Sequence, residues 1–176
     1  EDASWIQRLD LNTIHFTGPL DCGSVMIDTL SHVTRLCDLH LEVELGQDDW
    51  KRLMAFPQLN HLTRLCVAPI DYSYVQLSRI LSLPYLETLI LMSDGGNLRL
   101  PQKMTATQLK SLRLQGSFSS IFKWPQLPNL TRLRVNDSSD LGNAFTGDFF
   151  AQIQHSTQLT LLNLEGGDLF PQTQLA

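Results

Sequence analysis

The chain has 176 residues, of which 43% are hydrophobic and 18% are charged, and its formal net charge is −5. This size and balance predict one globular domain with a sizeable core and argue against a disordered chain. No apolar run approaches the roughly 18–20 residues of a membrane span, and the acidic balance argues against a nucleic-acid-binding surface, which normally carries a basic excess.

A hydrophobic phrase, apolar-x-x-Leu-x-apolar, recurs seven times along the chain at steps of 21 to 30 residues. A fixed phrase at such a period is typical of a leucine-rich-repeat solenoid. Each phrase predicts a short parallel strand whose second and third anchors point into the core, because side chains alternate faces along a strand. In chain order the anchors are Ile6/Leu9/Leu11, Leu36/Leu39/Leu41, Leu62/Leu65/Val67, Leu86/Leu89/Leu91, Leu109/Leu112/Leu114, Leu130/Leu133/Val135 and Leu159/Leu162/Leu164.

Parallel strands need long crossover connections, which are usually helical. Four connectors are expected to supply such helices, over residues 22–31, 48–55, 72–82 and 147–155. The connectors over 92–107 and 115–129 contain glycine and proline, which disfavour long helices. Extended or short 3₁₀ segments are therefore expected in those two connectors.

Three proline-containing phrases precede strands, and in each of them proline ends the helix while the following leucine returns to the core. They are Phe56-Pro57-Gln58-Leu59, Leu83-Pro84-Tyr85-Leu86 and Leu127-Pro128-Asn129-Leu130. With the seven strand phrases, this pattern resembles the irregular ribonuclease-inhibitor-like and F-box-associated leucine-rich-repeat proteins over essentially the whole chain. The resemblance implies an α/β solenoid, a right-handed horseshoe with seven short parallel strands on its concave face and helices and irregular segments on its convex face.

The whole chain, residues 1–176, is expected to form a single leucine-rich-repeat domain. Trp5 and Ile6 enter the first phrase almost at once, and neither end shows the polar cap that shields a solenoid's terminal cores. The sequence therefore predicts either a fragment of a longer array or terminal segments that cap the solenoid in an unconventional way. It contains no F-box segment, so the resemblance carries over no ligase role.

The residues between the core anchors predict a partner-binding surface on the concave side. An acidic row comes first, an apolar row follows, and two basic rows come next. Arginine and large apolar side chains are common in binding hot spots, and segregated charge orients a partner. The predicted partner-binding residues are Asp38, His40, Glu42, Arg64, Ile90, Met92, Arg113, Arg132, Arg134 and Asn136.

These features predict a non-enzymatic module that binds a protein partner, as a substrate receptor or adaptor does. Two alternatives stay open: a strand face of mixed polar residues with no binding role, and a structural segment that contacts its neighbours through its open ends. Arginines also suit phosphate, but no aromatic side chains interleave them to stack on bases, which argues against nucleic acid.

No catalytic residue, metal site or cofactor is predicted. The histidines show no ligand spacing such as His-x-x-x-His, and the chain has no P-loop, dinucleotide-binding or serine-hydrolase motif. His40 falls in register with Cys66, and a Cys–His pair can form a nucleophile. The favoured interpretation is that His40 and Cys66 are simply neighbours on a strand face of mixed composition.

The three cysteines have no paired spacing, which predicts free thiols in a reducing compartment, the cytoplasm or the nucleus. Two glycosylation sequons begin at Asn129 and Asn136. A glycan on either asparagine would instead indicate a secreted protein.

Overall fold

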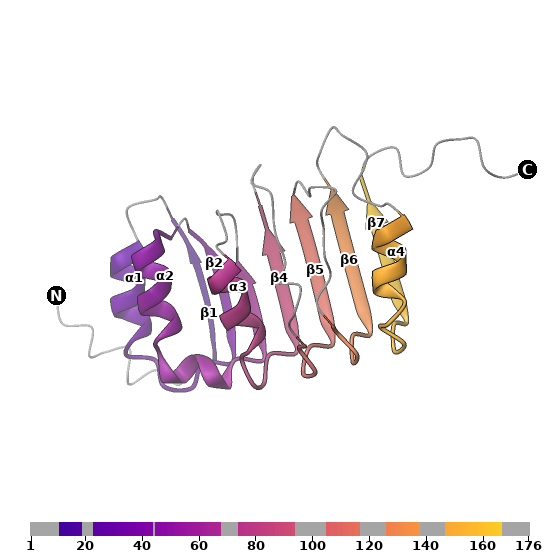
Figure 1. Cartoon of the computed structure of the whole chain (residues 1–176). Coiled ribbons are helices and arrows are strands. Elements are labelled where there is room, and N and C mark those ends of the chain that lie inside the picture. Colours follow the sequence, from indigo (N-terminus) through magenta and orange to yellow (C-terminus); the bar gives the residue numbers. More distant parts are fainter. Residues whose placement is uncertain are drawn as a thin grey trace, which may run out of the picture.

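The computed structural model describes residues 11–18, 23–43, 45–67, 74–93, 105–116, 126–137 and 147–166. In these ranges, seven strands form one parallel sheet in which the order of the strands follows the chain (Figure 1). The strands are β1 (Thr13–Thr17), β2 (Asp38–Glu42), β3 (Arg64–Val67), β4 (Thr88–Met92), β5 (Ser111–Gly116), β6 (Arg132–Asp137) and β7 (Leu161–Glu165). The expectation of an α/β architecture with seven parallel strands is confirmed.

The helices lie on one side of this sheet (Figure 1). They are α1 (Gly23–Leu30), α2 (Gln47–Met54), the 3₁₀ helix η3 (Pro57–His61), α3 (Tyr74–Leu81) and α4 (Gly147–Ile153). The four α-helices fall inside or overlap the four predicted ranges. The described parts of the connectors over 92–107 and 115–129 contain no helix, and an isolated parallel bridge joins Thr105 to Gln126 there.

The predicted strand anchored at Ile6, Leu9 and Leu11 lies outside the described ranges except for Leu11. Within these ranges, the strand that pairs with β2 is β1. In β1, Ile14 and Phe16 lie in register with Leu39 and Leu41. Leu11, Ile14 and Phe16 keep the spacing of the phrase, but isoleucine replaces the leucine that defines its second anchor.

The core lies between the sheet and the helices, and it consists of the predicted anchors stacked strand by strand. The second anchors of β2 to β6 lie in register with one another and are at most 1% exposed: Leu39, Leu65, Leu89, Leu112 and Leu133. Fully burying one leucine side chain contributes about 1.5–3 kcal/mol. A chain of such layers explains why the phrase recurs.

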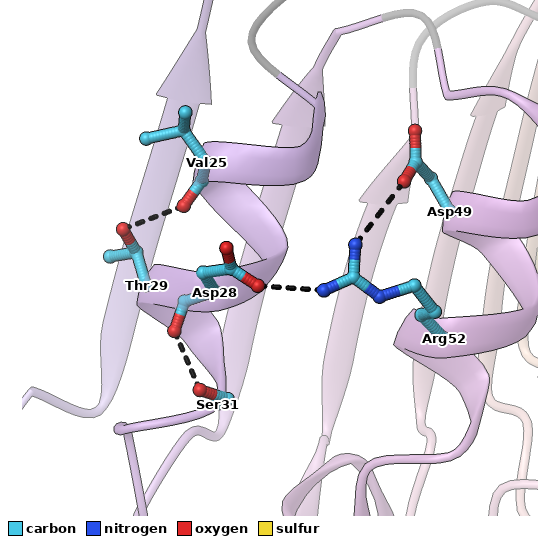
Figure 2. Close-up of polar contacts among 6 residues, drawn as sticks. All are labelled: Val25, Asp28, Thr29, Ser31, Asp49 and Arg52. Carbon is cyan, nitrogen blue, oxygen red and sulfur yellow. Dashed lines mark hydrogen bonds and ion pairs between the residues drawn. The ribbon is translucent and has the colours of Figure 1, made fainter.

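Helix α2 shows how the connectors cover this core. Its buried residues, Trp50, Leu53 and Met54, recur at helical spacing and so share one face. Acidic residues in its first turn and basic residues in its last turn complement the helix dipole. Arg52 also joins α2 to α1 through an ion pair with Asp28, which Figure 2 draws; its Nη2 atom lies 2.7 Å from Asp28 Oδ1. Because both side chains are exposed, this ion pair adds little stability.

Backbone hydrogen bonds tie neighbouring phrases together where the strands begin. The carbonyl of Cys37 accepts N–H groups of both Thr63 and Arg64, and the carbonyl of Thr63 accepts those of Glu87 and Thr88. The same pattern continues through Glu87, Lys110 and Thr131 to the start of β7.

Side-chain amides add further links between the phrases. Gln58 donates to the Leu30 carbonyl at 3.0 Å, Gln108 to the Leu81 carbonyl at 2.7 Å, and Asn129 to the Thr107 carbonyl at 2.6 Å. Each carboxamide thus joins its own phrase to a connector carbonyl of the preceding one. Of the helices that the structure describes, none combines the length and the apolar character needed to cross a membrane.

Candidate functional site

One face of the sheet points away from the core, and we call it the open face. Side chains alternate between this face and the buried anchors, as the burial of β5 and β6 shows. All ten residues predicted to bind a partner lie on the open face. They are Asp38, His40 and Glu42 on β2, Arg64 on β3, Ile90 and Met92 on β4, Arg113 on β5, and Arg132, Arg134 and Asn136 on β6.

Strand pairing aligns the open-face residues in rows that run across the sheet. Six spacings of about 4.8 Å between neighbouring strands give each full row a length of about 29 Å. The central row changes from imidazole through thiol and aliphatic side chains to guanidinium and amide. It consists of His15, His40, Cys66, Ile90, Arg113, Arg134 and Asn163.

The middle of the open face is apolar and only partly accessible. Ile90 and Met92 are half-buried, and Cys66 is 3% exposed even though its neighbours in the row are accessible. Burial raises the pKa of the Cys66 thiol to about 11. The predicted register of His40 with Cys66 is confirmed, but a thiol with that pKa is protonated at neutral pH, so it is no activated nucleophile.

The arginine cluster, Arg113, Arg132 and Arg134, occupies β5 and β6. All three side chains are exposed, and Arg113 lies in register with Arg134. Arg113 donates from Nη2 to Gln115 Oε1 at 3.3 Å. Among the residues that the structure describes, no carboxylate pairs with any of the three.

On the described strands after β2, Glu165 on β7 is the acidic residue of the open face. Two side-chain amides donate hydrogen bonds to its carboxylate. Asn136 donates from Nδ2 to Glu165 Oε2 at 3.0 Å, and Asn163 donates to Oε1 at 2.8 Å. With Arg113 and Arg134, these side chains line a hollow of about 30 Å³, which is room for one water-sized group. The arginine cluster therefore keeps its positive charge available to a partner.

The histidine cluster, His15, His40 and Glu42, occupies the opposite end of the open face, on β1 and β2. The two imidazole rings stack at a centroid distance of 3.9 Å with 10° between their planes. Glu42 Oε1 lies 3.1 Å from His40 Nε2 and 3.6 Å from His15 Nε2. His40 and Glu42 were predicted to lie on this face, but the sequence argument left out His15.

Electrostatics favour a neutral imidazole at His40. Desolvation lowers the pKa of His40, and so do the neighbouring His15 and Arg64, which outweigh Glu42 and Asp38. The Nε2 atom of His40 is buried and makes no hydrogen bond, even though Glu42 is close. Arg64 lies 3.9 Å from Asp38, so its charge is partly balanced at the border of the cluster.

An open groove of about 650 Å³ runs along the edge of the sheet where the strands begin. It is lined by residues that flank the first anchors, such as Tyr85, Gln108 and Asn129. Tyr85 is 60% exposed, and Lys110 pairs with Glu87 at 2.6 Å. Sequence analysis missed this groove, although the residues beside each first anchor could have indicated it.

The chain matches no protein-family model, and comparisons with curated proteins and with solved structures give no significant match. The geometry of the described residues therefore carries the functional argument.

Proposed function

We propose that this chain is a leucine-rich-repeat solenoid that works as a non-enzymatic protein-recognition module and binds an acidic segment of a partner on its open face. The observation that carries this proposal is the arginine cluster, whose three exposed guanidinium groups have no described carboxylate partner. In a chain of net charge −5, three cations gathered on one face suit an acidic ligand.

Two observations together support the proposal of a solenoid: the recurring phrase in the sequence and the order of the strands in the sheet. Each strand pairs with the next one along the chain, and each adds one layer to the same core. In a right-handed horseshoe the open face is the concave one, which such proteins commonly use for binding. Free thiols at Cys37 and Cys66 suit the cytoplasm or the nucleus.

The open face divides recognition between charge and apolar contact. Arginines on β5 and β6 attract carboxylates and bind them in a bidentate way. Ile90 and Met92 on β4 supply apolar surface directly beside them. Asp38 and Glu42 on β2 repel an acidic segment, which orients the partner toward the arginine cluster. The proposed role is that of an adaptor or a substrate receptor.

A capture experiment with quantitative mass spectrometry tests the proposal. Proteins that bind the wild-type chain are compared with those that bind Arg113→Glu/Arg134→Glu. The control, Lys51→Glu/Arg52→Glu, reverses two exposed charges on α2, on the other side of the sheet. The proposal expects a set of partners that the open-face variant loses and the control keeps. If both variants keep the same partners, the open face does not bind them.

A second candidate, an assembly segment that contacts neighbours through an end of the sheet, has an observation of its own. Leu162 on β7 is 43% exposed, whereas its register partner Leu133 is 0% exposed. Phe150 on α4 is 39% exposed as well. If this end packs against a further copy or a neighbouring segment, the wild-type chain associates in sedimentation experiments, and Leu162→Asp makes it monomeric.

A further inference from the structure

The histidine cluster combines three donor groups whose close approach neither the recurring phrase nor the proposed recognition requires. Parallel pairing of β1 with β2 sets His15 directly beside His40. Glu42 lies two residues after His40 on β2, so its side chain projects from the same face. Two imidazoles and one carboxylate therefore converge on the open face, and one donor atom from each lies within 4.8 Å of the other two.

The spacing of these donors fits a small metal ion. In a tetrahedral site with metal–ligand distances near 2.1 Å, neighbouring donors are about 3.4 Å apart. The distances from Glu42 Oε1 to the two Nε2 atoms, 3.1 Å and 3.6 Å, lie on either side of that value.

We propose that His15, His40 and Glu42 form a binding site for a divalent first-row transition metal, with Zn²⁺ as the probe that tests it. Imidazole nitrogen with carboxylate oxygen suits zinc and its neighbours, whereas magnesium and calcium prefer oxygen donors alone. Three protein ligands leave one coordination position, which water or a side chain of a binding partner fills.

Two features of the cluster favour an ion over a simple hydrogen-bonded group. His40 Nε2 is buried without a hydrogen bond, and a polar atom in that state is costly unless something binds it. Arg64 forms an ion pair with Asp38, so these two charges partly balance each other. The carboxylate of Glu42 then gives the cluster a net negative charge when the imidazoles are neutral. A bound dication would give His40 Nε2 a partner and would balance the negative charge of the cluster.

The stacked rings require one adjustment. A metal lies in the plane of each imidazole that binds it, and two stacked rings with centroids 3.9 Å apart and only 10° between their planes cannot both direct a nitrogen at one ion. Rotation about the terminal side-chain torsions tilts the planes toward a common point, and that torsion is soft. The side chain of His15 is 51% exposed, so it has room to turn.

Isothermal titration calorimetry of the untagged chain with zinc chloride tests the site. The proposal expects one zinc per chain, and it expects His15→Gln and Glu42→Gln each to weaken binding by about tenfold or more, because each removes one of three ligands. The control His155→Gln removes an exposed histidine beside β7 and leaves the affinity unchanged. X-ray absorption of the zinc-loaded wild type should show nitrogen and oxygen ligands and no sulfur.

Circular dichroism of each variant separates loss of a ligand from loss of the fold. Because His15 and Glu42 are exposed, their variants keep the wild-type spectrum, and His40→Gln adds a third measurement. The proposal is overturned if wild type shows no saturable zinc binding, or if His15→Gln binds zinc as tightly as His155→Gln does. Unchanged affinity in Glu42→Gln would exclude the carboxylate as a ligand and so overturn the three-donor site. None of these outcomes depends on the proposed recognition of a protein.

Discussion

The two ends of the open face use the same backbone positions for different chemistry. His15 and His40 occupy the central row on β1 and β2, and Arg113 and Arg134 occupy it on β5 and β6. At the first end, a carboxylate lies within 3.6 Å of both rings. At the second, the arginines have no described carboxylate partner. The leucine layers beneath are alike, so the residues between the leucines determine what each end can bind.

The largest expected effect tests whether both ends rest on one kind of core. Leu39→Ala, beneath the histidine cluster, and Leu133→Ala, beneath the arginine cluster, should each lower the free energy of unfolding by about 2–5 kcal/mol, because each leaves a cavity in a closed layer. Leu162→Ala should cost at most about half of that, since this side chain is 43% exposed. Urea denaturation measures all three, and a tolerated Leu133→Ala would show that the two ends are built differently.

A smaller loss of stability is expected from a substitution in the turn after β5, at the arginine end, than from the leucine substitutions. The turn after β2, at the histidine end, provides the comparison. Gly116 ends β5 with φ of +135°, and a Cβ there would collide with the Ser93 carbonyl oxygen. Gly116→Ala should therefore cost about 1–3 kcal/mol in the free energy of unfolding.

Gly46, after β2, is the matched control for that turn. Its φ is −65°, and the nearest atom to an added Cβ is Asp49 Oδ2 at 3.8 Å. Gly46→Ala should lower the free energy of unfolding by at most about 1 kcal/mol, because Gly46 is the N-cap of α2 and alanine is a poorer N-cap than glycine. Equal losses for the two variants, by the same urea titration, would contradict the strained turn at β5.

The smallest expected effect is a pH dependence that belongs to the histidine end alone. The pKa of His40 is lowered on folding, so the unfolded chain binds a proton more readily than the folded chain. The stabilising contribution of neutral His40 is present above its unfolded pKa of about 6.5 and is lost as pH falls through the folded pKa. Desolvation by burial is the largest cause of this lowered pKa; His15 and Arg64 lower it further, whereas Glu42 and Asp38 raise it. Cys66 is the register neighbour of His40 on β3.

Urea titrations at pH 7.5 and at lower pH check this dependence. The decrease in the free energy of unfolding between the two conditions should be smaller in His40→Gln than in wild type. Arg134→Gln, at the same row position on β6, should keep the wild-type decrease. A decrease of the same size in His40→Gln would assign the effect to other groups.

Much of the fold could be predicted from the sequence because leucine anchors act locally. Their spacing located six of the seven strands that the structure describes, and the need for crossover connections between them located the four described α-helices. The exception is β1, where Ile14 and Phe16 fill the core positions that leucine fills elsewhere. A pattern that requires leucine excludes them, although isoleucine and phenylalanine bury as well as leucine does and favour strands.

That one displaced strand explains why the histidine cluster was not predicted. With the first strand at residues 6–11, His15 falls in a connector, and no ligand spacing joins it to His40. Three donors from two strands meet through pairing register, which a search for short motifs does not detect. By contrast, the arginine cluster lies on strands whose register follows directly from the phrases, so its shared face was predictable.

The burial of Cys66 could not be predicted either. Its position in the row predicted an outward side chain, yet it is 3% exposed. A small side chain between longer neighbours such as His40 and Ile90 becomes covered by them, and that covering depends on side-chain conformations rather than on the pattern. The edge groove also depends on several connectors at once.

The affinity of a captured partner for three forms of the chain tests the central claim most directly, namely that the open face recognises a protein through its arginine cluster. Calorimetry with that purified partner should give a dissociation constant about tenfold or more higher for Arg113→Glu/Arg134→Glu than for wild type, while Lys51→Glu/Arg52→Glu stays close to wild type. Equal affinity for all three forms, with the fold of each variant verified by circular dichroism, would contradict the account.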